Sequence, residues 1–117
     1  MHLRPFGSTG LNVGAIGMGV MPLSVTRERP TEAEGIAVIH HAIDCGVTLF
    51  DTADSYCLDD SKAGHNERVL GRALAELPAS AWQNLTVATK GGLVRPGGRW
   101  EEHRLISSSL LCASVSP

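Results

Sequence analysis

Residues 31–51 read TEAEGIAVIHHAIDCGVTLFD, and this stretch combines the signals of a helix and of a buried strand. Thr31 and Glu34 have the spacing of a capping box, in which each side chain accepts a hydrogen bond from the other residue's backbone N–H. Gly46 is a left-handed stop, and residues 47–50 form a short β-prone run, as expected for a strand covered on both faces. Between these ends, four apolar residues recur on one helical face: Ile36, Ile39, Ala42 and Ile43.

The same order of elements occurs again further along the chain. Apolar side chains within residues 69–77 fall on one side of a second predicted helix, which Pro78 helps to end. Residues 85–89 form another strand-like run, which ends at Lys90, and residues 14–19 resemble a first short strand without a G-x-G-x-x-G pattern. Alternating strands and helices predict an α/β fold with a parallel sheet and right-handed crossovers.

Length and composition exclude several classes of protein. The 117 residues carry 10 Lys plus Arg against 12 Asp plus Glu, and this near-balance argues against a nucleic-acid partner. No window approaches the roughly 18 apolar residues of a membrane span. The first ten residues lack a secretory signal, so we expect a cytoplasmic protein without a membrane partner. The three cysteines form no C-x-x-C pair, which favours free thiols.

Three side chains suggest proton chemistry. If the strands pair in parallel, Asp51 and Lys90 lie just past the ends of neighbouring strands about 4.8 Å apart, where α/β proteins build their sites. Tyr56, the only tyrosine, follows Asp51 on the same loop. A nearby ammonium lowers a phenol's pKa, and a carboxylate could hold that ammonium charged. The three residue types fit a proton donor to a carbonyl oxygen.

Each of these residues also has a plainer interpretation. Asp51 could be a loop acid or helix cap, and Tyr56 could be a packing aromatic whose hydroxyl is satisfied. Lys90 could be a solvated surface charge, or the Schiff-base lysine of an aldolase-type barrel.

Other polar residues carry weaker signals. His40 and His41 flank the apolar stripe of the first helix, without an acidic partner at ligand spacing, so we expect no metal site. Asn66 could cap the second helix. Arg95 and Arg99 could bind an anion, although their Gly- and Pro-rich surroundings are more typical of an exposed loop.

Several separated motifs together resemble the N-terminal part of the aldo-keto reductases. They are FDTADSY at residues 50–56, NE at 66–67 with LG at 70–71, VATK at 87–90 and the opening GSTGLNV at 7–13. The likeness covers about residues 3–100, in the right order. It implies an incomplete TIM (β/α)8 barrel, with an N-terminal hairpin and about three βα units, because a whole barrel needs roughly 250 residues.

The resemblance also implies an activity and a role for each catalytic candidate. The family reduces aldehydes or ketones with NADPH. By that likeness Tyr56 would donate the proton, Lys90 would lower the pKa of Tyr56, and Asp51 would pair with Lys90. The expected partner is a small carbonyl compound.

The cofactor positions follow from the same likeness. Gly19, Val20 and Met21 match positions that lie beside NADP(H) in the family, and Asp51 is included with them. Val20 replaces the usual hydroxyl-bearing residue, which implies a weaker contact to the nicotinamide.

The sequence departs from the family pattern toward its end. The family's catalytic histidine has no counterpart, because His103 follows Lys90 too soon. The later strands, which supply most adenosine-phosphate contacts, are missing. We therefore expect a truncated chain that binds NADP(H) poorly and is inactive alone. Residues 1–102 form the barrel part and residues 103–117 a divergent tail, uncharged from Leu105 onward.

A non-enzymatic alternative also remains. About three strands leave unpaired sheet edges, which invite pairing with another chain. The chain could thus be a barrel fragment that self-associates through these edges.

Overall fold

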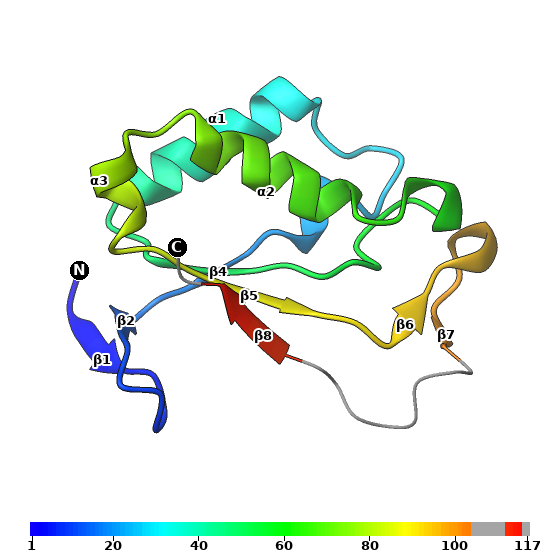
Figure 1. The fold of residues 1–117 in the computed structure, drawn as a ribbon. Helices are drawn as coiled ribbons and strands as arrows, with labels where there is room; N and C mark the ends of the chain where they lie inside the picture. The colour runs from blue at the N-terminus through cyan, green and yellow to red at the C-terminus, as the bar shows by residue number, and fades with distance from the viewer. Residues whose placement is uncertain (104–111, 116–117) are drawn as a thin grey trace.

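A mostly parallel sheet with helices on one face forms the centre of the molecule (Figure 1). The computed structural model describes residues 1–103 and the backbone of residues 112–115. The central sheet has the order β3-β4-β5-β8, and β3, β4 and β5 are parallel to one another. Its strands are β3 (Met18–Gly19), β4 (Leu49–Asp51), β5 (Thr86–Lys90) and β8 (Cys112–Val115). The predicted α/β fold is confirmed.

The remaining elements connect or flank this sheet. A separate hairpin pairs β1 (Leu3–Pro5) with β2 (Asn12–Gly14), as predicted for the N-terminus. A second hairpin pairs β6 (Leu93–Val94) with β7 (Glu101–Glu102). The helices are α1 (Glu32–Asp44), α2 (His65–Ala75) and the short α3 (Ala79–Trp82), with 3-10 turns at Met21–Leu23, Asp60–Lys62 and Pro96–Gly98.

Helix α1 begins as the sequence predicts. The Glu34 backbone N–H donates to Thr31 Oγ1 over 3.3 Å, and Glu34 Oε2 accepts from the Thr31 backbone N–H over 2.8 Å. These bonds complete the capping box. The Thr31 hydroxyl also donates to Glu34 Oε2 over 2.7 Å, and this bond, with that from the Thr31 N–H, holds the pKa of the Glu34 carboxyl below its usual range. After the helix, Gly46 has φ +90°, the left-handed conformation that glycine adopts without strain.

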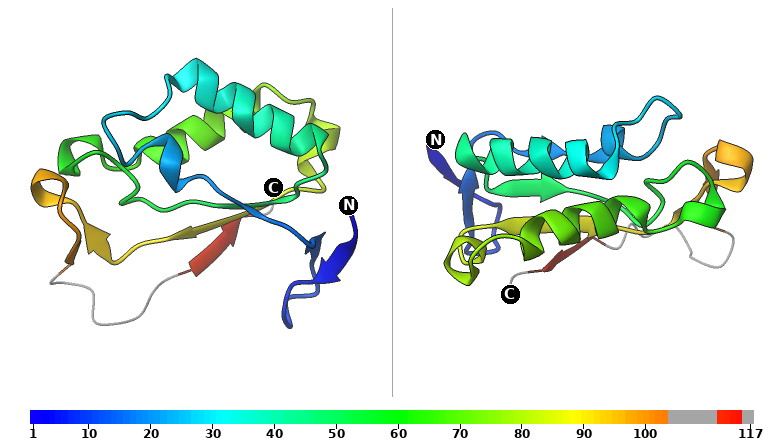
Figure 2. Two further views of the ribbon diagram at one scale, coloured as in Figure 1. Left: turned by 180° about the vertical axis from the view of Figure 1, so that it is seen from behind. Right: turned by 90° about the horizontal axis from the view of Figure 1, so that it is seen from above.

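The hydrophobic core lies between the two long helices and the sheet. Helices α1 and α2 run side by side over the sheet in both views of Figure 2. Ile39 of α1, Leu70 of α2 and Phe50 of β4 are fully or almost fully buried there, together with Val20. Burial of each such side chain stabilises the fold by about 1.5–3 kcal/mol.

Among the described residues, the strand β4 is covered on one face only, which corrects the expectation of cover on both. Phe50 points into the core, whereas Leu49 is half-buried and Asp51 is exposed. No described helix lies over the second face of the sheet (Figure 1). Polar side chains such as Asp51 can therefore stand on that face.

The edge of β5 is occupied by the chain itself. Strand β8 pairs antiparallel with β5, placing Cys112 opposite Lys90 and Val115 opposite Val87. The predicted boundary near residue 102 stays a prediction. Of the predicted tail, residues 104–111 and 116–117 lie outside the described residues.

The helices of the described chain have at most 13 residues, the length of α1. None within residues 1–103 is both long and apolar enough to cross a bilayer.

Candidate active site

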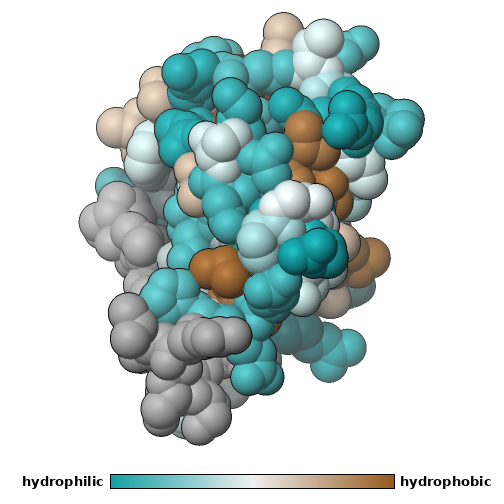
Figure 3. Space-filling view, turned by 90° about the vertical axis from the view of Figure 1, so that its right-hand side faces the viewer, coloured by the Kyte–Doolittle hydropathy of each residue, from teal (hydrophilic) through white to brown (hydrophobic). Residues whose placement is uncertain are grey.

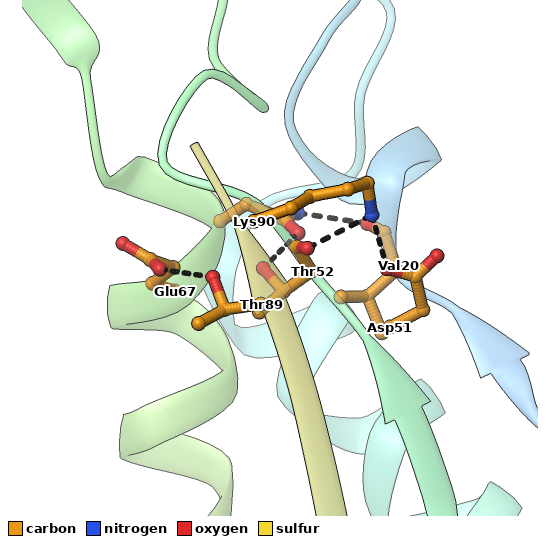
Figure 4. A network of polar contacts seen from close by, with 7 residues as sticks. Val20, Asp51, Thr52, Glu67, Thr89 and Lys90 are labelled. Atoms are coloured by element: carbon orange, nitrogen blue, oxygen red, sulfur yellow. Dashed lines mark hydrogen bonds and ion pairs between the residues drawn. The ribbon is translucent and has the colours of Figure 1, made fainter. Parts of the chain in front are cut away.

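The ends of two neighbouring strands bring Asp51 and Lys90 together (Figure 4). Asp51 is the last residue of β4 and Lys90 the last of β5. Asp51 pairs in register with Ala88, and because side chains alternate along a strand, Lys90 lies on the same face two positions further on. Lys90 Nζ donates hydrogen bonds to Asp51 Oδ1 and, over 3.1 Å, to the Thr52 carbonyl oxygen. The predicted meeting of these two side chains is present.

The tyrosine lies beside this ion pair. Lys90 Nζ is 4.7 Å from the centroid of the Tyr56 ring, within the range of a cation–π contact. The Trp100 ring packs edge-to-face against Tyr56, with the two centroids 6.3 Å apart and an interplanar angle of 87°. The structure therefore groups all three predicted catalytic residues and adds Trp100.

The charge of Lys90 depends on these neighbours. Burial acts to lower the pKa of the ammonium, but the hydrogen bonds and charges of Asp51 and Tyr56 outweigh burial and raise the pKa above its usual value. The side chain of Lys90 is 26% exposed and that of Asp51 51%. Lys90 is thus held as an ammonium beside an accessible carboxylate.

The predicted cofactor residues differ in what they expose. The space beside Gly19 is open, since a Cβ built there would meet no atom within 4 Å, and Met21 is 38% exposed. Val20 is fully buried, its N–H donates to the Asp51 carbonyl over 3.0 Å, and its carbonyl accepts from Asn66 over 2.8 Å. Val20 therefore presents neither its side chain nor a free backbone group to a ligand.

Asn66 has a different role from the predicted helix cap. The N-cap of α2 is Gly64, in the left-handed conformation with φ +72°. The Asn66 side chain is 1% exposed and binds inside the fold. One signal could have indicated this: Asn66 lies three and seven positions before Val69 and Ala73, on the same buried stripe.

The loop that carries the two arginines is partly buried, which corrects its description as an exposed loop. Arg95 is 6% exposed, and its guanidinium carbon lies 4.1 Å from the centroid of the Trp100 ring. Arg99 does remain exposed. Sequence reasoning missed both Trp100 and the hairpin β6–β7 that places it. The end of the molecule that carries this hairpin is mostly hydrophilic, with separate hydrophobic patches (Figure 3).

The histidines and cysteines were the other candidates for metal or thiol chemistry. Within residues 1–103, no three His, Cys, Asp or Glu side chains are grouped for a metal ion. His40 Nε2 instead lies 2.7 Å from the Ala73 carbonyl oxygen. Cys45 and Cys57 are free thiols, and burial raises the pKa of Cys57, so its thiol stays protonated at neutral pH.

Comparisons with known proteins identify relatives of one family. The sequence profile of the aldo/keto reductase family matches residues 15–109. The chain is 38% identical over 92 residues to a Glycine max protein named "Probable aldo-keto reductase 1", covering 78% of this chain and 24% of that protein. It is 36% identical over 94 residues to the 6-dehydroglucose reductase of Novosphingobium aromaticivorans, covering 80% of this chain and 30% of the relative.

Solved structures give the same result for the fold. The holo form of an aldo-keto reductase from Bacillus halodurans matches with a TM-score of 0.65 and 28% identity, over 87% of this chain and 30% of that chain. The chain thus spans about a quarter to a third of the length of the proteins it matches. The fold is that of part of a (β/α)8 barrel.

Proposed function

The chain belongs to the aldo/keto reductase family, and from this premise we propose that Tyr56, Lys90 and Asp51 serve the reduction of an aldehyde or ketone. One observation supports the proposal most: a single ammonium, that of Lys90, contacts both the Asp51 carboxylate and the Tyr56 ring. NADPH, when bound, supplies the hydride.

Each of the three side chains has a distinct part in the proton transfer. The Tyr56 O–H bond breaks as its proton passes to the carbonyl oxygen of the substrate, and a phenolate remains. The Lys90 ammonium stabilises this negative oxygen by its charge. Asp51 holds Lys90 in its charged form and on the correct face of the sheet. These roles need no metal-ligating group.

We propose that Gly19 and Met21, together with Asp51, which lies opposite Gly19 in the sheet, would hold the nicotinamide. The space beside Gly19 is open and Met21 is exposed, so a ligand could reach both residues. The side chain of Val20 lies in the core, so it would support Gly19 and Met21 from inside the fold and would not contact the cofactor. A hydroxyl at residue 20 would therefore be buried in the conformation described.

The charge of Lys90 argues against a Schiff-base lyase. Attack of a lysine on a carbonyl requires the neutral amine, which enzymes obtain by lowering the lysine pKa. Here Asp51 and Tyr56 raise the pKa of Lys90, so the nucleophilic form is scarce at neutral pH.

A cytoplasmic location remains our prediction, in keeping with the free thiols of Cys45 and Cys57.

A chimeric enzyme tests the proposed roles. Residues 1–102 would replace the aligned segment of the Novosphingobium reductase, and NADPH oxidation with an aldehyde would be followed at 340 nm. We expect turnover, and a loss of at least about a hundredfold in kcat for Tyr56→Phe, the low end of general acid catalysis. Ser61→Ala, an exposed change on the same loop, serves as the control. A folded, NADPH-binding chimera whose Tyr56→Phe variant stays fully active would refute the proposal.

The uncovered sheet face favours a second candidate function, self-association. In the described sheet the outer strands are β3 and β8, because β8 already pairs with the edge of β5. We also propose that the 117-residue chain alone reduces no carbonyl compound. For the association, we propose that a second copy contacts β3 or the uncovered face. Light scattering that shows a stable monomer at high concentration would contradict the association.

A further inference from the structure

A buried amide connects helix α2 with the ends of two strands. Asn66 Nδ2 donates to the Val20 carbonyl oxygen over 2.8 Å and to Ser24 Oγ over 2.7 Å. Its Oδ1 accepts a hydrogen bond from Thr52 Oγ1 over 2.8 Å. Asn66, Thr52 and Ser24 are all 1% exposed or less. Such a fully bonded network costs little to bury, whereas loss of any member leaves a buried polar group unpaired.

The chemistry of the partners determines how the amide is oriented. A backbone carbonyl can only accept, so the amide nitrogen must face Val20, and the amide oxygen then faces the Thr52 hydroxyl. Ser24 Oγ, which accepts from Asn66, keeps its own proton for His65 Nδ1 at 2.8 Å. This arrangement suits a neutral His65, whose pKa is lowered by burial. Every hydrogen-bonding group of the Asn66 amide is therefore used.

The residues that Asn66 binds are those that hold the ion pair. The Val20 N–H donates to the carbonyl oxygen of Asp51 over 3.0 Å, and Thr52 directly follows Asp51 in the chain. The Thr52 carbonyl oxygen accepts from Lys90 Nζ, and the Thr52 N–H donates to the Ala88 carbonyl over 2.8 Å (Figure 4). Asp51 is thus held from both sides by residues that the Asn66 side chain binds.

We propose that Asn66 is a positioning residue, which through Val20 and Thr52 holds Asp51 and the Thr52 carbonyl where they bind Lys90. Asn66 itself touches neither Lys90 nor Tyr56 in the interactions described, and acts only through these two residues. An apolar residue would fill the same place on the buried stripe of α2, but it would leave the Thr52 hydroxyl without its partner. The Val20 carbonyl would lose the Asn66 amide and keep only the Leu23 N–H, which donates to it over 3.0 Å.

The reactivity of Lys90 reports on this arrangement without requiring turnover. The chain has only two lysines, Lys62 and Lys90, so Lys62, which is exposed, is an internal reference. Competitive acetylation of the whole chain near pH 8, read by peptide mass spectrometry, gives the ratio of the Lys90 rate to the Lys62 rate. Only the neutral amine reacts, so loosening the bonds that keep Lys90 charged raises this ratio.

Four variants separate positioning from general stability. Asn66→Leu removes the whole amide, and Thr52→Val removes only the hydroxyl that binds it, with almost no change of shape. Thr52→Ser retains that hydroxyl and should restore the wild-type ratio. Val69→Ala is the matched control, because it truncates a buried side chain on the same helix outside the network.

The expected results differ among these variants. In folded protein, Asn66→Leu should raise the Lys90 to Lys62 ratio about tenfold, the change that one pKa unit produces, and Thr52→Val should raise it severalfold. Thr52→Ser and Val69→Ala should stay within about twofold of the wild type. An unchanged ratio in folded Asn66→Leu overturns the proposal. If that variant does not fold, an unchanged ratio in Thr52→Val overturns it, and an equal rise in Val69→Ala does so in either case.

The positioning role of Asn66 rests on the site of the proposed reductase, but this role and the reductase function can fail separately. The acetylation ratio measures how the Asp51–Lys90 pair is held, whatever reaction the pair serves. The Tyr56→Phe chimera measures whether the tyrosine donates a proton. A changed ratio together with an active Tyr56→Phe chimera would retain the role of Asn66 and reject the reductase roles.

Discussion

Replacing Arg95 tests a balance between two opposing contributions to the free energy of unfolding. Its guanidinium is buried, and among the residues that the structure describes Nε has no hydrogen-bond partner. None of the ion pairs among the described residues includes Arg95. What holds the charge is the Trp100 ring at 4.1 Å and a long hydrogen bond of 3.4 Å from Nη2 to the Leu58 carbonyl.

The sizes of these contributions predict that removing the charge of Arg95 changes the free energy of unfolding little. The cation–π contact with Trp100 contributes about 0.5–2 kcal/mol, and the bond to Leu58 at most about 1 kcal/mol. Keeping the guanidinium away from water costs several kcal/mol in the other direction. Arg95→Met keeps the apolar stem and removes the charge. We therefore expect its free energy of unfolding to lie no more than about 1 kcal/mol below that of the wild type, and it could exceed the wild-type value. Arg95→Ala also removes the stem and should lower the free energy of unfolding by about 2 kcal/mol.

Urea unfolding followed by circular dichroism measures both variants. Arg99→Met is the matched control, because this arginine is exposed on the same hairpin and should change stability by no more than about 0.5 kcal/mol. A loss of more than about 2 kcal/mol in Arg95→Met would refute the reasoning. It would mean that the guanidinium gains more from its surroundings than its burial costs.

Three further substitutions test the helix cap, the histidine and the core. Thr31→Ala removes the capping box of α1 and should lower the free energy of unfolding by about 0.5–2 kcal/mol; an unchanged urea midpoint would contradict this. Burial, with Arg29 and Arg68, lowers the pKa of His65 below that of the unfolded chain. The unfolded state therefore binds more protons, and stability falls as pH decreases below about 6.5. His65→Asn should flatten this decline between pH 7.5 and 5, and equal declines would show that His65 is not its source. Ile39→Ala empties a fully buried position and should cost about 2–5 kcal/mol in thermal unfolding, whereas the exposed Val38→Ala should cost far less.

Much of the framework could be predicted from short stretches of sequence. The capping box of Thr31 and Glu34 and the stop at Gly46 mark the limits of α1 to within a residue or two. These signals are reliable because each depends on residues within one helical turn. The parallel order of the strands follows from the alternation of elements, and it puts Asp51 and Lys90 at the same edge of the sheet.

The parts of the site that sequence reasoning missed depend on distant neighbours. Asn66 looks like a cap when only its neighbours in the chain are considered, yet it meets Val20, 46 positions earlier. Arg95 looks like a loop cation until the hairpin β6–β7 brings Trp100 beneath it. Whether β4 is covered on one face or on both likewise depends on which distant elements pack against it.

The sequence by itself thus determined the family, the order of the strands and helices, and the identity of the Asp51, Tyr56 and Lys90 group. Only the tertiary structure decided how Lys90 is kept charged, through Asp51 and Tyr56, and which buried amide holds Asp51 and the Thr52 carbonyl in place. The physical reason is that local rules describe backbone preferences over a few residues. The charge and position of a buried polar group depend on partners that the fold brings from elsewhere in the chain.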